Sequence, residues 1–188
     1  MRGESSAKII SSSFDSDRRR WLMLALIFGA GFITIAMHDV FRWPMKLPGR
    51  HGLELMAMLM FVRCASAERY AATLAVLGGV TATALLGHGN GIESIVFLLQ
   101  GLAIDLAWRY STFQGWRGLL LLPLLAGLVH SIKPLVKLAF METVGITSDS
   151  LSSGLLYPVL THWIFGAVGA LVGVMAWQSF QKTRQHTS

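Results

Sequence analysis

Charged residues are scarce in this sequence. Of its 188 residues, 14% are Asp, Glu, Lys or Arg and 53% are hydrophobic. Soluble domains carry about 25% charged and about 45–50% apolar residues. So few charged groups cannot cover a water-facing surface, and a total of 5 prolines excludes a Pro-rich disordered chain. The composition therefore predicts an integral membrane protein, whose length allows several spans and little else.

The sequence has a single cysteine and none of the common catalytic motifs. The single cysteine, Cys64, can form neither an intramolecular disulfide nor a cysteine-based zinc site. The sequence has no GxxxxGKS/T phosphate loop, no GxSxG nucleophile elbow and no HExxH pair. We therefore expect no enzyme activity and no cofactor, and any ATP-driven step must come from a partner protein.

Six apolar runs reach or approach the roughly 20 residues that a helix needs to cross a bilayer. They cover residues 21–37, 53–62, 70–86, 92–108, 118–140 and 155–177, and the second is the shortest. The predicted fold is an all-α membrane protein, a bundle of six transmembrane helices over residues 21–178. A flexible, Ser-rich cytoplasmic tail is expected over residues 1–20 and a second cytoplasmic tail over residues 179–188.

The net charge of +6 is distributed as membrane orientation requires, not as nucleic-acid binding requires. The sequence shows no basic face interleaved with aromatic residues, which a nucleic-acid surface needs. If the N-terminus is cytoplasmic, eleven of the 16 Lys and Arg residues fall on the cytoplasmic side and five on the outer side. Because cytoplasmic loops are enriched in Lys and Arg, both termini are predicted to be cytoplasmic in a multi-pass protein of a prokaryotic cell membrane.

Ionisable residues in the apolar runs are predicted to meet in the outer half of the bundle. Such residues are costly in lipid and are usually paired, cavity-facing or functional. His130, Lys133 and Lys137 lie at i, i+3 and i+7, so they share one helix face near the outer end of the fifth run. Cations and histidines beside two glutamates suit a small anionic or zwitterionic solute. The predicted solute-binding residues are Arg42, Lys46, Arg50, Glu54, Glu93, His130, Lys133, Lys137 and His162.

Some of these residues have simpler explanations. Each lysine could anchor a helix at the membrane interface, and each histidine could hydrogen-bond a neighbouring helix. Asp105 and Arg109, at i and i+4 near the inner face, are expected to form a structural pair. Pro134 follows Lys133 and frees a backbone carbonyl, which predicts a local kink in the fifth helix.

Small residues recur every fourth position on the third and sixth runs. This spacing lets helix backbones approach closely in lipid, and packing within the subunit is its usual role. Docking onto another membrane subunit is the alternative. The residues concerned are Ala75, Gly79, Thr83 and Gly87, the pair Gly166 and Ala170, and the pair Gly169 and Gly173.

The layout over residues 21–178 resembles the substrate-binding S component of energy-coupling factor (ECF) transporters. Similar local patterns lie at residues 59–79, at Gly87, at residues 97–102 and at residues 166–170. The resemblance implies solute capture from outside beneath the first outer loop, with release inside after the subunit topples. It also implies a transmembrane coupling protein and two cytoplasmic ATPases as partners, docked at Ala25, Gly29 and Ala30. Substrates of this family are mostly vitamins, their precursors and transition metals, and Arg2 replaces the histidine typical of the metal branch.

Two other classes of protein remain open at this stage. Paired histidines on facing helices could ligate haem or a metal in a membrane enzyme or cofactor-holding subunit, and the candidates are His38, His51, His130 and His162. In a purely structural membrane subunit, the polar residues would serve only to anchor helices. The solute itself cannot be read from the sequence.

Overall fold

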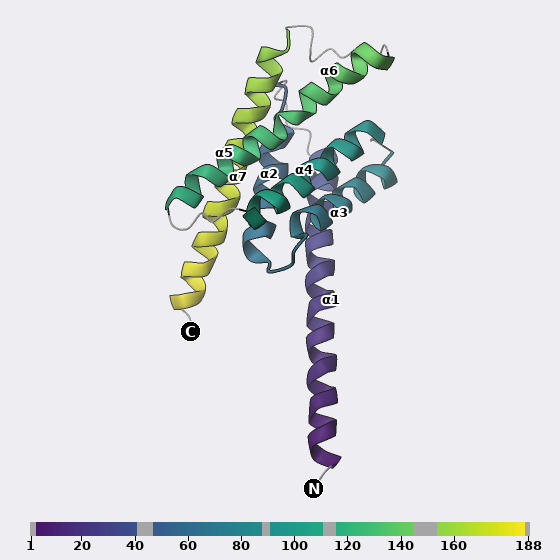
Figure 1. Cartoon of the computed structure of the whole chain (residues 1–188), viewed down its shortest axis with the longest axis vertical. Helices are drawn as coiled ribbons and strands as arrows, with labels where there is room; N and C mark the ends of the chain where they lie inside the picture. Colours follow the sequence, from purple (N-terminus) through teal and green to yellow (C-terminus); the bar gives the residue numbers. More distant parts are fainter. Residues whose placement is uncertain (1–2, 41–46, 88–90, 111–115, 145–153, 187–188) are drawn as a thin grey trace.

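A computed structural model describes residues 3–40, 47–87, 91–110, 116–144 and 154–186, and its regular elements are all helices (Figure 1). Their bounds are α1 (Gly3–Val40), α2 (His51–Ala65), α3 (Ala71–Leu85), α4 (Gly91–Tyr110), α5 (Trp116–His130), α6 (Ile132–Val144) and α7 (Leu156–His186). Only Ser131 separates α5 from α6, so these two helices follow each other as one interrupted rod. The described chain thus has helices at all six predicted places.

Four helical segments are long and apolar enough to cross a membrane: Asp17–His38, Gly91–Tyr110, Leu120–Phe140 and Leu156–Gln185. This finding fits the membrane protein that the composition predicts. The other two predicted spans correspond to helices α2 and α3, each of which has 15 residues. At 1.5 Å per residue, such a helix is about 22 Å long, against a hydrocarbon core of about 30 Å. Six full spans therefore stay a prediction.

The short helix α2 lies at the centre of the bundle. It contacts α1, α3, α4, α5 and α7. Its side chains Leu55, Met56, Leu59 and Met60 are almost completely buried and form the middle of the hydrophobic core. Because other helices surround α2, its length does not have to match the bilayer as that of a lipid-facing helix does.

Glycines bring two pairs of helices into backbone contact. A Cβ atom on Gly31 of α1 would overlap the carbonyl oxygen of Ala75 on α3. In the same way, Cβ atoms on Gly169 and Gly173 of α7 would overlap the backbone of α2 at Leu53 and Ala57. The small-residue stripes of the third and sixth runs thus pack helices within this chain, which was the favoured expectation, except at Gly87, where an added Cβ atom meets open space.

The expected pair between Asp105 and Arg109 is wrong. Asp105 of α4 instead accepts a hydrogen bond from Arg63 of α2 at 3.0 Å. Its carboxylate also accepts from the backbone N–H groups of Ala72 and Thr73, at 3.1 and 2.8 Å, and so caps the N-terminus of α3. Arg109 lies over the ring of the neighbouring Tyr110. The i, i+4 rule considers only partners on one helix, and the partner here lies on another helix.

Arg63 completes this junction, which we call the inner brace (Arg63, Asp105 and the turn 66–70). The guanidinium donates to the carbonyls of Glu68 and Ser66, at 2.6 and 2.7 Å. Both Arg63 and Asp105 are 3% exposed. One buried ion pair therefore joins the end of α2, the start of α3 and the last turns of α4.

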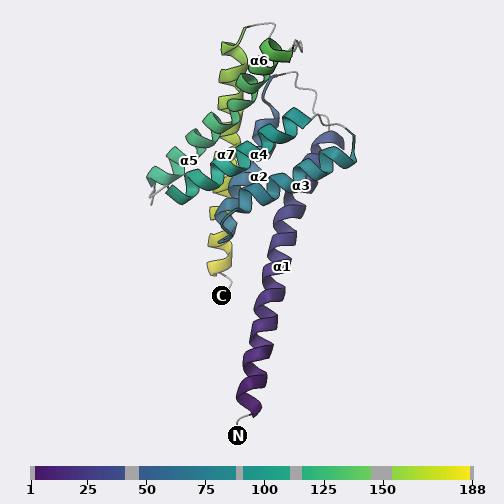
Figure 2. The ribbon, with the colours of Figure 1, turned by 45° about the vertical axis from the view of Figure 1, so that its right-hand side comes forward.

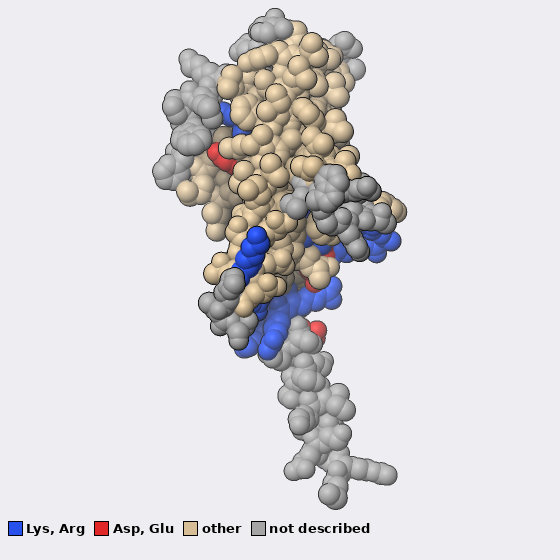
Figure 3. Space-filling view, turned by 90° about the vertical axis from the view of Figure 1, so that its left-hand side faces the viewer, with Lys and Arg blue, Asp and Glu red and all other residues tan. Residues whose placement is uncertain are grey.

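Both chain termini lie at the same end of the molecule, below the inner brace in Figures 1 and 2. Lys and Arg side chains gather at this end on the face drawn in Figure 3. Arg20 of α1 also pairs with Glu68 there, at 3.3 Å. The side of the membrane on which this end lies stays a prediction. Helix α1 begins at Gly3 and helix α7 ends at His186. Most of both predicted tails is therefore helical.

Candidate solute-binding site

The interruption of the α5–α6 rod lies beside the residues that the sequence singled out. Pro134 has no N–H group, so it cannot donate to the carbonyl of His130 four residues earlier. Ser131 sits at the break and donates its hydroxyl to the carbonyls of Gly127 and Val159, at 3.1 and 3.2 Å. The predicted interruption is present, three residues before the proline. Irregular backbone at membrane depth is typical of transporter binding sites.

Gln100 of α4 fills the place opposite this break. Its amide nitrogen lies 3.3 Å from His130 Nδ1, 3.4 Å from the His130 carbonyl and 3.5 Å from the Val129 carbonyl. The side chain is fully buried. Sequence reasoning did not include Gln100 in the site, although a polar residue in the middle of an apolar run was a usable signal.

His130 is fully buried and only partly satisfied. Among the described residues, His130 Nε2 and Gln100 Oε1 make no well-formed hydrogen bond, and the same holds for Arg63 Nε in the inner brace. The backbone of Gly49 lies within weak hydrogen-bonding reach of the His130 ring. The imidazole ring lies against Gly52 of α2 and Gly166 of α7, where an added Cβ atom would meet it closely. Its centroid is 5.1 Å from that of His162. Unpartnered buried polar atoms are uncommon in native structures and call for an explanation.

The charged residues of the fourth and fifth runs meet at the next turn of α6. Glu93 Oε1 lies 3.2 Å from Lys137 Nζ and 3.6 Å from Lys133 Nζ. Lys133 is 8% exposed, and its ammonium group lies 4.9 Å from the centroid of the Phe97 ring. Among the described residues, one carboxylate thus faces two ammonium groups beside the break, whereas Glu54, the second carboxylate of this region, lies beside His38.

A second polar group joins α1 to α2. His38 Nδ1 and Glu54 Oε2 are 2.8 Å apart, and the rings of His38 and His51 are in contact, with centroids 3.5 Å apart. A cavity of about 10 Å³ borders these residues and Phe97. This volume is about that of one water site. Glu54 was a predicted solute ligand, whereas both histidines belonged to the haem or metal alternative.

His162 is held from two directions. Its Nδ1 atom donates to the carbonyl of Pro158, four residues earlier on α7, at 2.7 Å. Gly49, with φ of 82°, packs directly on it, so that a Cβ atom there would lie 2.7 Å from His162 Cα. Only glycine fits this backbone conformation and this approach without strain. The segment before α2 therefore lies directly on His162.

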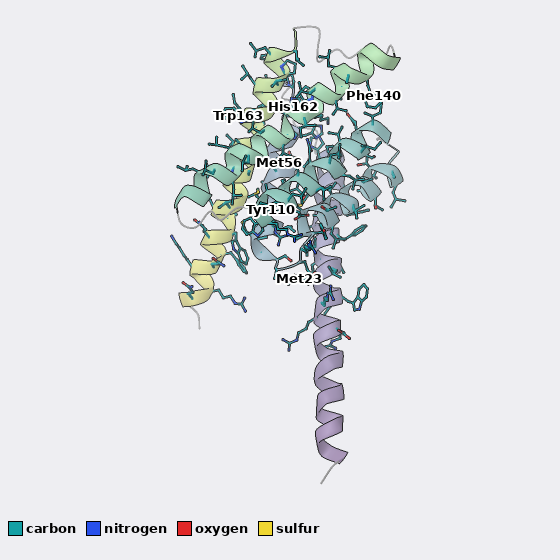
Figure 4. The ribbon with its side chains drawn as sticks, viewed as in Figure 1. Met23, Met56, Tyr110, Phe140, His162 and Trp163 are labelled. Atoms are coloured by element: carbon teal, nitrogen blue, oxygen red, sulfur yellow. The ribbon has the colours of Figure 1, made fainter. Side chains whose placement is uncertain are left out.

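These groups form one set, which we call the outer cluster. Its members are His38, His51, Glu54, Glu93, Gln100, His130, Lys133, Lys137 and His162. His51 lies within electrostatic range of Arg50, His38, His130 and Lys133, and so links the two polar groups. His162 lies in the upper part of the bundle, and Tyr110 lies near the inner brace below it (Figure 4). Arg42 and Lys46 lie outside the described residues.

The outer cluster does not form a metal centre in this arrangement. Within the part of the chain that the structure describes, no three His, Cys, Asp or Glu side chains converge as a metal ion requires. The four histidines instead form two ring pairs, His38 with His51 and His130 with His162. The rings pack on each other, and those of His38, His130 and His162 also hydrogen-bond to protein groups.

Comparison of this chain with protein families, with curated proteins and with solved structures finds no match. The function therefore has to be argued from the outer cluster itself.

Proposed function

We propose that this chain is the substrate-capture subunit of an ECF-type importer and binds a small anionic or zwitterionic solute at the outer cluster. The observation that carries the proposal is a fully buried pair of atoms at the helix break that make no well-formed hydrogen bond, His130 Nε2 and Gln100 Oε1. The excess charge of Lys133 and Lys137 over Glu93 lies next to them.

The energetics of burial favour binding over a purely structural role. A buried polar atom without a partner costs about 1–3 kcal/mol, and a buried charge costs more. Apolar residues of similar shape would stabilise the helix packing better. A solute that accepts a hydrogen bond from His130 and neutralises the excess ammonium charge would offset these costs. Binding therefore explains why these polar residues are buried here.

Access to the cluster is expected from the outer end. The cavity beside His38 and His51 has room for about one water. An open groove of about 410 Å³ also borders His38 and Glu54, so a vitamin-sized solute has space there but needs an opening to reach the buried His130. The segment at Gly49 covers His162 and precedes α2 directly. Separation of this segment from α7 would expose His162. The ATP drive is proposed to come from partner subunits.

We expect His130→Ala and Lys133→Ala each to weaken solute binding by about 100-fold or more, because each removes a buried group that the solute contacts. Binding is measured as ligand-dependent thermal stabilisation of the purified chain with a panel of vitamins and small organic acids. Lys182→Ala, an exposed change at the opposite end, is the matched control. Membrane insertion should be unchanged in all variants. Wild-type affinity in both cluster variants would contradict the placement of the site.

The proposed partner surface is the small-residue stripe on α1. Ala25 is exposed, and an added Cβ on Gly29 meets no atom within 4 Å, so both face outward. Ala30 instead packs against the core of this chain. Ala25 and Gly29 are therefore the more suitable docking residues, and they remain proposals.

Gly29→Leu is expected to prevent assembly while leaving the fold intact, since the added side chain occupies open space in the isolated chain. The measurement is co-purification of the tagged chain with a co-expressed coupling protein and its two ATPases. Leu102→Ala, on an exposed face of α4, is the control. Full assembly of the Gly29→Leu variant would remove this face of α1 from the proposal.

A further inference from the structure

We infer that Gln100 fixes the tautomer of His130, so that His130 presents an Nε2–H donor and the outer cluster recognises an oxyanion, not a metal ion. This inference rests on the proposed function and specifies the chemistry of the solute. It assigns to Gln100 the part of a positioning residue that acts through His130.

The orientation of the Gln100 amide follows from its neighbours. The atom facing the helix break lies near the carbonyl oxygens of Val129 and His130 as well as His130 Nδ1. Carbonyl oxygens only accept hydrogen bonds, so the NH2 group must face them. The opposite orientation would place the amide oxygen against two other oxygens.

The tautomer of His130 follows from this orientation. An amide NH2 group has no acceptor capacity, so His130 Nδ1 must present its lone pair to Gln100. In the neutral ring the proton is then on Nε2. A proton on Nδ1 would point at the NH2 group and meet its hydrogens. His130 Nε2 is therefore a buried donor. It makes no well-formed hydrogen bond among the described residues, and the backbone of Gly49 lies close enough to the ring to accept only weakly.

The two neighbouring histidines show the opposite arrangement. A metal-binding histidine usually donates its second N–H to a carbonyl or carboxylate, which leaves the ligating nitrogen bare. His162 Nδ1 faces the Pro158 carbonyl and His38 Nδ1 faces Glu54, so each neutral ring has its lone pair on Nε2. His130 differs because its neighbour is a donor. Its Nε2 cannot ligate a metal while Gln100 holds this orientation.

The charge around His130 favours the same class of solute. Lys133 and His162 both lie within electrostatic range of His130. Lys133 shares its carboxylate, Glu93, with Lys137, which lies closer to it. A carboxylate or phosphate group can accept from Nε2–H and also neutralise the ammonium excess. A divalent cation would add to this excess and find no lone pair on His130.

Gln100→Glu provides the sharpest test, because a carboxylate accepts from Nδ1–H and moves the proton of the neutral ring away from Nε2. The carboxylate also faces the carbonyl oxygens of Val129 and His130, so thermal unfolding is measured to show that the variant is folded. Full-length, 15N-histidine-labelled protein in nanodiscs is used, and one-bond 15N–1H couplings show which nitrogen carries the proton. We expect the proton on Nε2 in the wild type and on Nδ1 in Gln100→Glu. Sodium acetate and orthophosphate are titrated against the Nε2 resonance, and Zn²⁺ is titrated separately.

Two further variants separate the tautomer from a packing effect. His130→Gln keeps an N–H donor near the position of Nε2 and is expected to retain oxyanion binding within about 10-fold. Gln100→Glu is expected to weaken it by about 10- to 100-fold, as for the loss of a hydrogen bond to a charged group. Zn²⁺ binding is compared between the wild type and Gln100→Leu, because the carboxylate of Gln100→Glu is itself a zinc ligand. Gln100→Leu controls for the loss of the side-chain amide alone.

Three results would overturn the inference: a wild-type proton on Nδ1, a shift of the wild-type His130 Nε2 resonance on addition of Zn²⁺, or no wild-type response to either oxyanion. The proposed function is judged separately, by the vitamin and organic-acid panel with His130→Ala and Lys133→Ala. If that panel gives binding but the tautomer is wrong, only the inference fails. If Nε2 carries the proton and the oxyanions bind but no panel member does, the capture function fails instead.

Discussion

Replacing Asp105 by Ala is expected to lower the free energy of unfolding by about 3–5 kcal/mol, because it leaves the buried Arg63 charge without its counter-charge. The same change removes the acceptor for the N–H groups of Ala72 and Thr73 at the start of α3. Thermal unfolding of the purified chain measures the loss. The single cysteine, Cys64, adjoins Arg63 and is partly buried, so its rate of thiol labelling reports opening at the inner brace.

The double change Arg63→Met with Asp105→Leu is the control for this prediction. It removes both charges, so it is expected to recover the part of the lost stability that comes from the unpaired Arg63 charge. The N–H groups of Ala72 and Thr73 still lack their acceptor. Arg109→Ala should have little effect, because Arg109 lies outside the brace. If Asp105→Ala unfolds like the wild type and Arg109→Ala does not, the structural pairing described above is wrong.

Gly31→Ala is expected to separate α1 from α3 and to destabilise the chain by about 1–3 kcal/mol, as overpacked cores do. A Cβ atom at this position would overlap the Ala75 carbonyl oxygen, and backbone cannot move aside as a flexible side chain can. Thermal unfolding again provides the measurement. The yield of a non-reducible chemical crosslink between the two helices would report their separation.

Gly29→Ala is the matched control, since it lies two residues away on the same helix and its added methyl group meets open space. Alanine also has the higher helix propensity, so this variant should be unchanged or slightly more stable. Equal stability of Gly29→Ala and Gly31→Ala would show that α1 and α3 are not in backbone contact.

Helix positions were predictable from this sequence, but the number of full spans was not. Apolar runs locate helices because burying backbone polar groups in lipid requires them. The length of a run does not say whether a helix faces lipid or other helices. The central helix α2 is surrounded by five others, so its 15 residues do not need to cover a bilayer.

Part of the candidate site was also predictable. Depth and helix spacing predicted that residues of the fourth and fifth runs would meet, and the structure brings Glu93 together with Lys133 and Lys137. The role of Gln100 was not predictable, because it depends on a break in another helix, 30 residues away. Arg63 and Asp105 are 42 residues apart, and no local rule connects them.

The inner brace has a mechanical consequence. It ties α2, α3 and α4 at a single buried point near one end of the bundle. Helices that are joined at one end can separate only by tilting away from each other about that point. Displacements then grow with distance from this point and are largest around His51 and Glu93, at the far ends of α2 and α4. Opening of the proposed solute site therefore does not require the ion pair to break.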